Sequence, residues 1–278
     1  MEKPIHPIIM GILNITPDSF YDGGRFNSDK AWLAQAEKML SEGVDIVDVG
    51  GFSSRPGCDL IDEDEELKRV LPIVAGLKCR FPDLKISIDT FRSKISRECI
   101  HAGASIVNDI SGGNIDPKIW DTISENQHVT YILMHGVENL ESLHRNADEN
   151  ADIVSIVKEF FKTKMEQLQE KGIDSQRIIL DPGFGFGKTT AQNYRLLYYL
   201  NTFAEMGTIL AGLSRKSMIW KVLKIMPGKS LPGTMILNIL ALLNRATYLR
   251  VHDVAEAVAT VKLFEEFRSS GLTEDYIN

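Results

Sequence analysis

The amino-acid sequence predicts a single-domain (β/α)8 barrel, and three observations lead to this fold class. Eight short apolar runs rich in β-branched residues alternate with stretches of helical spacing, the pattern of parallel strands joined by helices. A polar residue or polar loop follows each run, as expected where a barrel collects its active site at the strand ends. The 278 residues also suit one barrel of about 250 residues. No linker divides the chain, so we expect one domain over residues 1–278.

A strand is expected wherever an apolar run is followed directly by a polar residue or segment. The runs, each with the residue or segment that follows it, are Ile8–Leu13 before Asn14, Ile46–Val49 before 50–56, Lys85–Ile88 before Asp89, Ser105–Val107 before Asn108, Tyr131–Met134 before His135, Ile178–Leu180 before Asp181, Ile209–Leu213 before Ser214, and Tyr248–Val251 before His252.

Helices are expected where apolar residues recur every three or four positions between these strands. The helix over 63–80 opens with acidic residues and contains Pro72, which is expected to bend it. The helix over 151–171 has the clearest apolar stripe, and Gly172 ends it. The seventh unit is interrupted at Pro227, which adds a further helix to the barrel. The expected helices cover residues 29–42, 63–80, 151–171, 191–200, 217–223, 233–244 and 254–267.

The charge pattern excludes a general nucleic-acid-binding protein. The formal net charge is −7 and the sequence has no run of Lys or Arg. Binding to a phosphate backbone requires a clustered basic face. A small anionic ligand stays compatible with the sequence, because local cations act even inside a negatively charged protein.

Cysteine usage and hydropathy predict a cytoplasmic protein. Cys58, Cys79 and Cys99 are scattered, and an odd, sparse set is typical of a reducing compartment. The first residues lack a basic region followed by an apolar stretch, so no signal peptide is expected. No apolar run approaches the ~18 residues of a membrane span, so no membrane partner is expected.

Two carboxylates, Asp89 and Asp181, end different strands. They could form a general acid/base pair, ligate a metal, or accept hydrogen bonds from the N–H edge of a heterocycle. No His/Asp cluster accompanies them, which disfavours a metal cage. Asn108 adds a donor and an acceptor at the neighbouring strand end.

The glycine-rich segment 181–188 follows a strand and precedes a helix. Its glycines suit either a tight turn or a loop whose amides approach an anion. The spacing fits neither a Walker A loop nor a dinucleotide-binding fingerprint.

Cations also gather at the expected strand ends, where they would converge on one barrel mouth and hold a phosphate- or carboxylate-bearing substrate. Any one of them alone would be read as a surface cation. Asn14, with the 16–19 loop, could hold a Mg²⁺ attached to such a phosphate. The cationic residues are Arg55, Arg215, Lys216, Arg250 and His252.

These motifs, taken together and in order, resemble dihydropteroate synthase, a family of folate biosynthesis. The resemblance runs from about residue 8 to the last expected helix. The motifs that carry it are Gly11-Ile12-Leu13-Asn14-Ile15-Thr16-Pro17-Asp18-Ser19-Phe20, Ser54-Arg55-Pro56-Gly57, Asp89-Thr90, Asn108-Asp109-Ile110, Leu133-Met134-His135, Asp181-Pro182-Gly183-Phe184-Gly185-Phe186-Gly187-Lys188, Ser214-Arg215-Lys216 and Arg250-Val251-His252-Asp253.

The resemblance implies a Mg²⁺-dependent transferase. It would join 6-hydroxymethyl-7,8-dihydropterin diphosphate to 4-aminobenzoate through a cationic pterin-methyl intermediate, releasing diphosphate. It also implies a homodimer formed through late helices and a target for sulfonamides. The substrates are small molecules, and no nucleic acid or membrane takes part.

The resemblance assigns roles residue by residue. The pterin pocket would comprise Asp89, Asn108, Met134, Asp181, Lys216 and Arg250. The aminobenzoate side would comprise Ser54, Arg55, Pro56, Phe186 and Ser214. The diphosphate would meet Asn14, Arg55, Arg250 and His252, with Asn14 as the metal ligand. Catalysis would fall to Asp89, Lys216, Arg250 and His252.

The chain departs from the family pattern at three places. Phe52-Ser53-Ser54-Arg55-Pro56 stands where the family usually has Glu-Ser-Thr-Arg-Pro, and the segment after His135 differs from the usual Met-Arg-Gly. Arg245 stands where Gly is usual, which we attribute to a helix end. Two alternatives stay open: a pterin-binding methyltransferase, and a paralogue that binds pterin without turnover.

Overall fold

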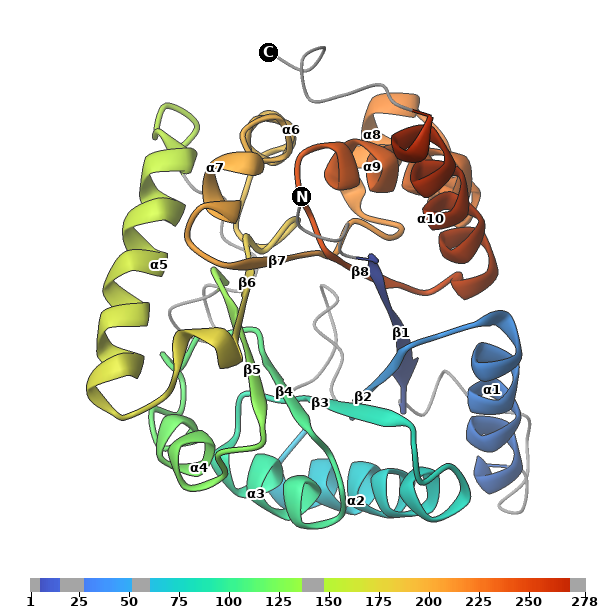
Figure 1. Cartoon of the computed structure of the whole chain (residues 1–278), viewed down its shortest axis with the longest axis vertical. Helices are drawn as coiled ribbons and strands as arrows, with labels where there is room; N and C mark the ends of the chain where they lie inside the picture. The colour runs from blue at the N-terminus through green and yellow to red at the C-terminus, as the bar shows by residue number, and fades with distance from the viewer. Residues whose placement is uncertain (1–5, 16–27, 52–60, 137–147, 271–278) are drawn as a thin grey trace.

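A computed structural model of the protein describes residues 6–15, 28–51, 61–136 and 148–270. Eight parallel strands form a closed barrel in chain order, with β1 hydrogen-bonded to both β2 and β8. This confirms the predicted fold class, and Figure 1 looks down the ring of strands. The strands are β1 (Ile8–Asn14), β2 (Ile46–Gly50), β3 (Lys85–Asp89), β4 (Ile106–Asp109), β5 (Thr130–Met134), β6 (Ile178–Asp181), β7 (Thr208–Ala211) and β8 (Tyr248–Val251).

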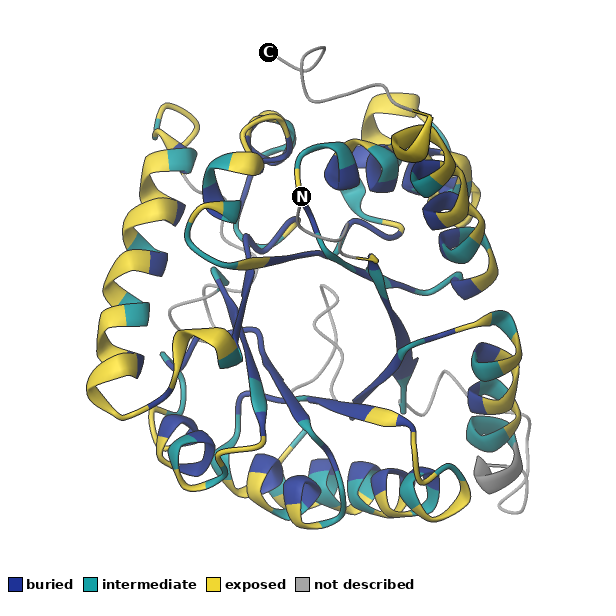
Figure 2. Ribbon diagram, in the orientation of Figure 1, coloured by how far each residue is buried: buried dark blue, intermediate teal, exposed yellow. Residues whose placement is uncertain are grey.

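Helices surround the barrel and cover the outer faces of the strands. Their inward sides are buried and their outward sides exposed, as Figure 2 shows around the ring. The helices are α1 (Ser28–Glu42), α2 (Glu63–Arg80), α3 (Ser93–His101), α4 (Ile119–Glu125), α5 (Ile153–Glu170), α6 (Thr190–Tyr198), α7 (Asn201–Ala204), α8 (Ser217–Leu223), α9 (Leu231–Leu243) and α10 (Val254–Ser269). Within the described residues, no helix is both long and apolar enough to span a lipid bilayer.

Each of the seven predicted helices has a counterpart in the structure, including the short α6 and α8, whereas three helices of the described ranges were missed, among them α7. Helix α2 spans Glu63–Arg80 as predicted, and the side chain of Asp62 caps it by accepting from Glu65 N at 2.7 Å. Helices α3 and α4 were not predicted. The run 209–213 was read as one strand, but β7 ends at Ala211.

Two apolar layers hold the barrel together. The larger core lies between strands and helices, whereas a smaller cluster fills the inside of the barrel. This interior cluster consists of Met10, Ile46, Ile106, Ile132, Ile179 and Leu210, with Ile8 and Tyr248 packed against it. The interior is therefore apolar in this layer, and polar side chains are left to the strand ends.

Arg245 follows the end of α9 in a left-handed conformation. Its φ is 70°, whereas the preceding Asn244 has φ −91°. The structure thus agrees with the helix-end interpretation, because glycine takes this conformation without strain.

Candidate active site

The strand ends bring three of the expected pterin-pocket residues into one hydrogen-bonded network. Arg250, near the end of β8, donates from Nη2 to Asp89 Oδ2 at 2.5 Å and from Nε to Asp48 Oδ2 at 2.7 Å. Asn108, on β4, donates from Nδ2 to the same Asp48 oxygen at 3.1 Å. Arg250 therefore lies between two carboxylates from neighbouring strands, and Asn108 joins them through Asp48.

Burial dominates the electrostatics of this network. It raises the pKa of Asp89 to about 7, an effect that Arg250 offsets only in part. Asp48 also contributes to the rise, as expected for a second carboxylate nearby. The network thus holds charges that water does not screen, and an added ligand charge would act on it strongly.

Asp181 and Lys216 face the same region from β6 and from the segment after β7. Asp181 Oδ1 accepts a hydrogen bond from Gly183 N at 2.7 Å, and burial raises the Asp181 pKa. Burial and nearby Arg250 lower the pKa of Lys216 to about 8. The Lys216 ammonium lies 4.2 Å from the centre of the Phe186 ring.

The glycine-rich segment is shaped by close packing. At Gly183 (φ 71°), an added Cβ would lie 2.1 Å from the carbonyl oxygen of His135, so no other residue fits. Gly185 N donates to Asn193 Oδ1 at 2.7 Å, which occupies that amide. Lys188 Nζ donates to three carbonyl oxygens, those of His135, Gly183 and Phe186, at 2.9–3.0 Å. At these positions the glycines therefore form a tight turn, and not a loop whose amides approach an anion.

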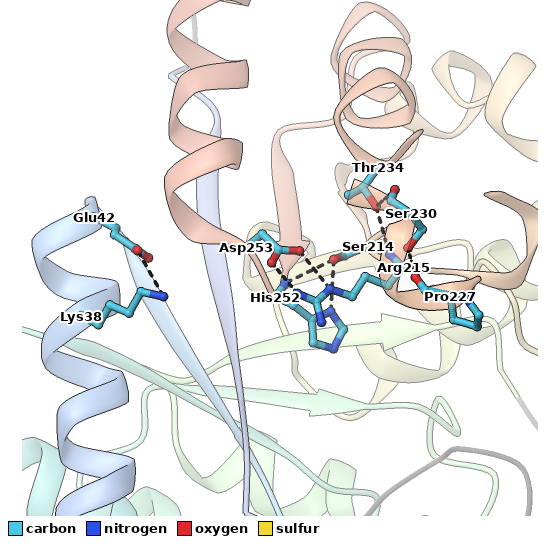
Figure 3. Close-up of polar contacts among 9 residues, drawn as sticks. All are labelled: Lys38, Glu42, Ser214, Arg215, Pro227, Ser230, Thr234, His252 and Asp253. Carbon is cyan, nitrogen blue, oxygen red and sulfur yellow. Dashed lines mark hydrogen bonds and ion pairs between the residues drawn. The ribbon is translucent and has the colours of Figure 1, made fainter. Parts of the chain in front are cut away.

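His252 and Ser214 meet where the segments after β7 and β8 lie side by side (Figure 3). Ser214 Oγ accepts from His252 N at 3.2 Å and lies 3.1 Å from His252 Nδ1. Because burial lowers the pKa of His252 to about 4, the ring is neutral near pH 7. A neutral ring carries its proton on one nitrogen only, so Nδ1 either donates to Ser214 Oγ or accepts from it, according to the tautomer.

Arg215 lies close enough to His252 to help lower the pKa of its ring, but its own charge is paired with a carboxylate. Its guanidinium is bound to Asp253 at 3.0 Å through Nε and 2.5 Å through Nη2 (Figure 3). Its backbone is left-handed (φ 57°), and its N–H donates to Thr234 at 3.1 Å. The left-handed turn directs Arg215 to the rim, whereas Lys216 is directed inward.

Met134 and Phe186 belong to one apolar cluster at this end of the barrel. Phe91, Ile110 and Met134 are buried, and Ile115 and Phe186 pack against them. Residues expected on the pterin side and on the aminobenzoate side therefore share one apolar surface. Such a surface suits flat aromatic rings.

Asn14 ends β1 next to Gly50. A Cβ on Gly50 would lie 3.5 Å from Asn14 Oδ1 and 3.6 Å from Asp89 Oδ2, so the glycine keeps the space between them open. Ser54, Arg55 and Pro56, together with Phe52 and the segment 137–147, lie outside the described residues. Their expected roles remain predictions.

Asp48 was not singled out from the sequence. It lies inside an apolar run, and a parallel strand covered on both faces shows no alternation that would reveal which residues point inward. The only available signal was a lone carboxylate in that run, which needs a buried partner.

Comparison with known proteins adds independent information. The family model described as "Pterin binding enzyme" matches residues 10–252. The dihydropteroate synthase of Clostridium beijerinckii is 40% identical over 257 residues, covering 92% of each chain.

Solved structures agree with the sequence comparison. Dihydropteroate synthase from Clostridium difficile, crystallised in the presence of pteroic acid, has a TM-score of 0.89 at 37% identity, covering 96% of this chain and 98% of that one. The Yersinia pestis enzyme with a sulfonamide drug has a TM-score of 0.86 at 37% identity, covering 95% of both chains. The chain belongs to the dihydropteroate synthase family of pterin-binding enzymes.

Proposed function

We propose that this protein condenses 6-hydroxymethyl-7,8-dihydropterin diphosphate with 4-aminobenzoate to give 7,8-dihydropteroate and diphosphate. The observation that carries the proposal is the network of Asp89, Arg250 and Asn108, with Asp181 and Lys216 beside it. Family membership supports the same chemistry. The two relatives compared by structure also carry the synthase name, which favours this reading over a methyltransferase.

The pterin would bind through acceptors at the strand ends. Asp181 has one oxygen occupied by Gly183 N, which leaves its other oxygen for N–H groups of the heterocycle. Asn108 supplies an amide oxygen, and Lys216 supplies a donor. Met134 would lie against the ring from the apolar cluster.

The diphosphate would bind at Arg250 and His252. In the tautomer that accepts from Ser214 at Nδ1 and carries its proton on Nε2, the neutral His252 ring would donate a hydrogen bond to a phosphate oxygen, and Arg250 would supply a positive charge. As the C–O bond breaks, negative charge grows on the diphosphate, so these donors stabilise the transition state more than the bound substrate.

Mg²⁺ fits the donor chemistry of the site. The described residues contain no group of three or more His, Cys, Asp or Glu side chains that could hold a metal. Magnesium needs none, because it takes one or two protein oxygens and completes its shell with phosphate and water. We propose Asn14 Oδ1 as its protein ligand. When bound, the ion would neutralise charge on the leaving diphosphate.

The remaining steps need little from the protein. Loss of diphosphate leaves a pterin-methyl cation, which the nearby Asp89 carboxylate would stabilise through the ring. The neutral aniline nitrogen of 4-aminobenzoate then forms the new C–N bond and loses its proton, so no strong base is required. Phe186 and Ser214, with Ser54, Arg55 and Pro56, would hold the aminobenzoate.

We propose that sulfonamides compete for the aminobenzoate side. The Yersinia pestis relative was solved with a sulfonamide drug, and the shared family supports the same competition here. A sulfonamide should raise the KM for 4-aminobenzoate and leave kcat unchanged. Inhibition that does not respond to 4-aminobenzoate would contradict this.

We further propose a homodimer formed through the late helices. Ile236 and Leu240 on α9, and Leu263 and Phe267 on α10, are large apolar side chains with 40–68% of their surface exposed. Such a patch commonly marks an interface. Sedimentation should give a dimer that Leu263→Glu dissociates, whereas Ile156→Glu, an equally apolar exposed site on α5, should leave it intact.

A cytoplasmic location is also proposed. Of the three cysteines, Cys79 and Cys99 lie in the described part of the chain, and both are free thiols.

Activity of the purified protein tests the proposed function. Both substrates with Mg²⁺ should yield dihydropteroate and diphosphate in equal amounts, and omission of either substrate or addition of a chelator should abolish both. Binding of the pterin substrate without product would instead identify a pterin-binding protein that has lost turnover.

A further inference from the structure

The geometry points to Asp48 as a positioning residue that sets the hydrogen-bonding pattern of the pterin pocket by orienting Asn108 and Arg250. This inference rests on the proposed function and adds a residue to it. Asp48 lies on β2 between Ile46, which belongs to the interior cluster, and Gly50 at the strand end. It therefore sits one layer below the pocket.

Asp48 acts through its neighbours. Its residue surface is 0% exposed, so a ligand entering the pocket has no surface of Asp48 to touch. One oxygen, Oδ2, accepts from both Asn108 Nδ2 and Arg250 Nε. A single buried atom thus fixes two side chains assigned to the pterin pocket. Support of this kind is what holds binding groups in a productive geometry.

The carboxylate also decides which way the Asn108 amide faces. An ionised carboxylate only accepts hydrogen bonds, so Asn108 must turn its NH2 group toward Asp48. Its oxygen is then directed away from Asp48 and offered as an acceptor. Asn108 is 3% exposed, so its amide has little freedom to take the opposite orientation.

Fold stability gives no reason for a carboxylate here. Asp48 Oδ1 has no hydrogen-bond partner among the described residues, and neither has Ser87 Oγ, although Ser87 is the register partner of Asp48 on β3. A buried carboxylate oxygen without a donor destabilises the fold. Arg250 keeps a second carboxylate, Asp89, if Asp48 is neutralised. What Asp48 provides is therefore the acceptor Oδ2, and both of its donors are pocket residues.

The variant Asp48→Leu removes the shared acceptor and keeps a side chain of similar size. Arg250 Nε and Asn108 Nδ2 then lose the oxygen to which both donate, so the Asn108 amide is no longer held with its own oxygen directed away from position 48. We expect the Kd for 6-hydroxymethylpterin, measured by calorimetry, to rise at least about 10-fold, as for a lost bond to an oriented acceptor.

The KM for 4-aminobenzoate should stay unchanged in the same variant, because neither Asn108 nor Arg250 was assigned to the aminobenzoate side. The conservative variant Asp48→Asn should keep most of the affinity for the pterin. Its amide oxygen can take the place of Oδ2 and accept from both Arg250 Nε and Asn108 Nδ2, while its NH2 takes the place of Oδ1, which has no partner among the described residues. A residue that only supports the fold would not separate pterin affinity from the KM for 4-aminobenzoate in this way.

Asp45→Asn is the matched control. Asp45 precedes the same strand, and its Oδ2 accepts from Ile9 N at 2.7 Å at the opposite end of the barrel. This variant should lose stability and keep pterin affinity. Unchanged affinity in Asp48→Leu, or an equal loss in Asp48→Asn and Asp48→Leu, would overturn the inference and leave the proposed function intact. A wild-type protein that does not bind pterin would overturn both.

Discussion

Replacing Asp181 with asparagine isolates the charge at the strand end that faces the expected pterin. Asp181 Oδ1 accepts from Gly183 N at 2.7 Å, and this amide has only an N–H to offer. The asparagine therefore places its oxygen there and its NH2 where Oδ2 had been. The pocket loses a charged acceptor and gains a donor without a change in size.

The expected loss follows from the strength of a charge-assisted hydrogen bond. Such bonds contribute about 1.5–3 kcal/mol, so the Kd for the pterin should rise roughly 10- to 160-fold. Burial raises the Asp181 pKa, so the wild-type affinity should also fall in acid as the carboxylate takes up a proton. The affinity of Asp181→Asn should lack this component of the pH dependence.

Isothermal calorimetry with 6-hydroxymethylpterin at several pH values measures both effects. Asp109→Asn is the matched control, because Asp109 is also a buried strand-end carboxylate and accepts from the N–H two residues later, Ser111 N, at 2.8 Å. Asp109 also binds Tyr131 at 2.7 Å, so this variant should lose stability and keep affinity in its folded form. Equal affinity of wild type and Asp181→Asn would refute the role of the charge.

Three further predictions concern stability, each read from urea unfolding. The pKa of His252 is about 4 in the fold against 6.5 for an ordinary histidine, so between these values the unfolded chain binds the extra proton and stability falls as the pH is lowered. From pH 7 to pH 5, wild type should lose about 2 kcal/mol more than His252→Gln, and parallel curves would argue against it. Arg245→Gly should stabilise by about 1 kcal/mol by removing a left-handed side chain, whereas Asn244→Gly, at φ −91°, should not. Lys188→Met removes the donor from one buried and two partly buried carbonyl oxygens and should destabilise the fold by at least about 2 kcal/mol; an unchanged unfolding midpoint would contradict this.

The sequence identified the strand ends because parallel topology places them together. Once eight runs alternate with helices, Asp89 and Asn108 must end on the same side of the barrel, and the structure links them through Arg250 and Asp48. The long helices were equally readable, since α2 and α5 each offer several turns of apolar spacing.

The features that could not be predicted from the sequence depend on local backbone geometry and on which side of a strand a residue faces. Helices α3 and α4 have nine and seven residues and were missed, although α6 and α8 have the same lengths and were predicted, so length alone does not account for the two omissions. The direction of Arg215 depends on a left-handed φ that its side chain does not favour. The position of Asp48 in the barrel could not be predicted, because the sequence does not show which side of a strand covered on both faces points inward.

The left-handed backbone conformation of Arg245 affects which further mutations this protein can accept. It lies in the turn that leads from α9 into β8, at the end of the barrel opposite the strand ends that carry Asp181 and Arg250. Strain stored there serves no chemistry, so relieving it should not trade activity for stability. A variant stabilised at this turn could then tolerate destabilising changes at the mouth. The stabilised variant could therefore accept mutations that alter substrate or drug recognition and that the present protein is not stable enough to accept.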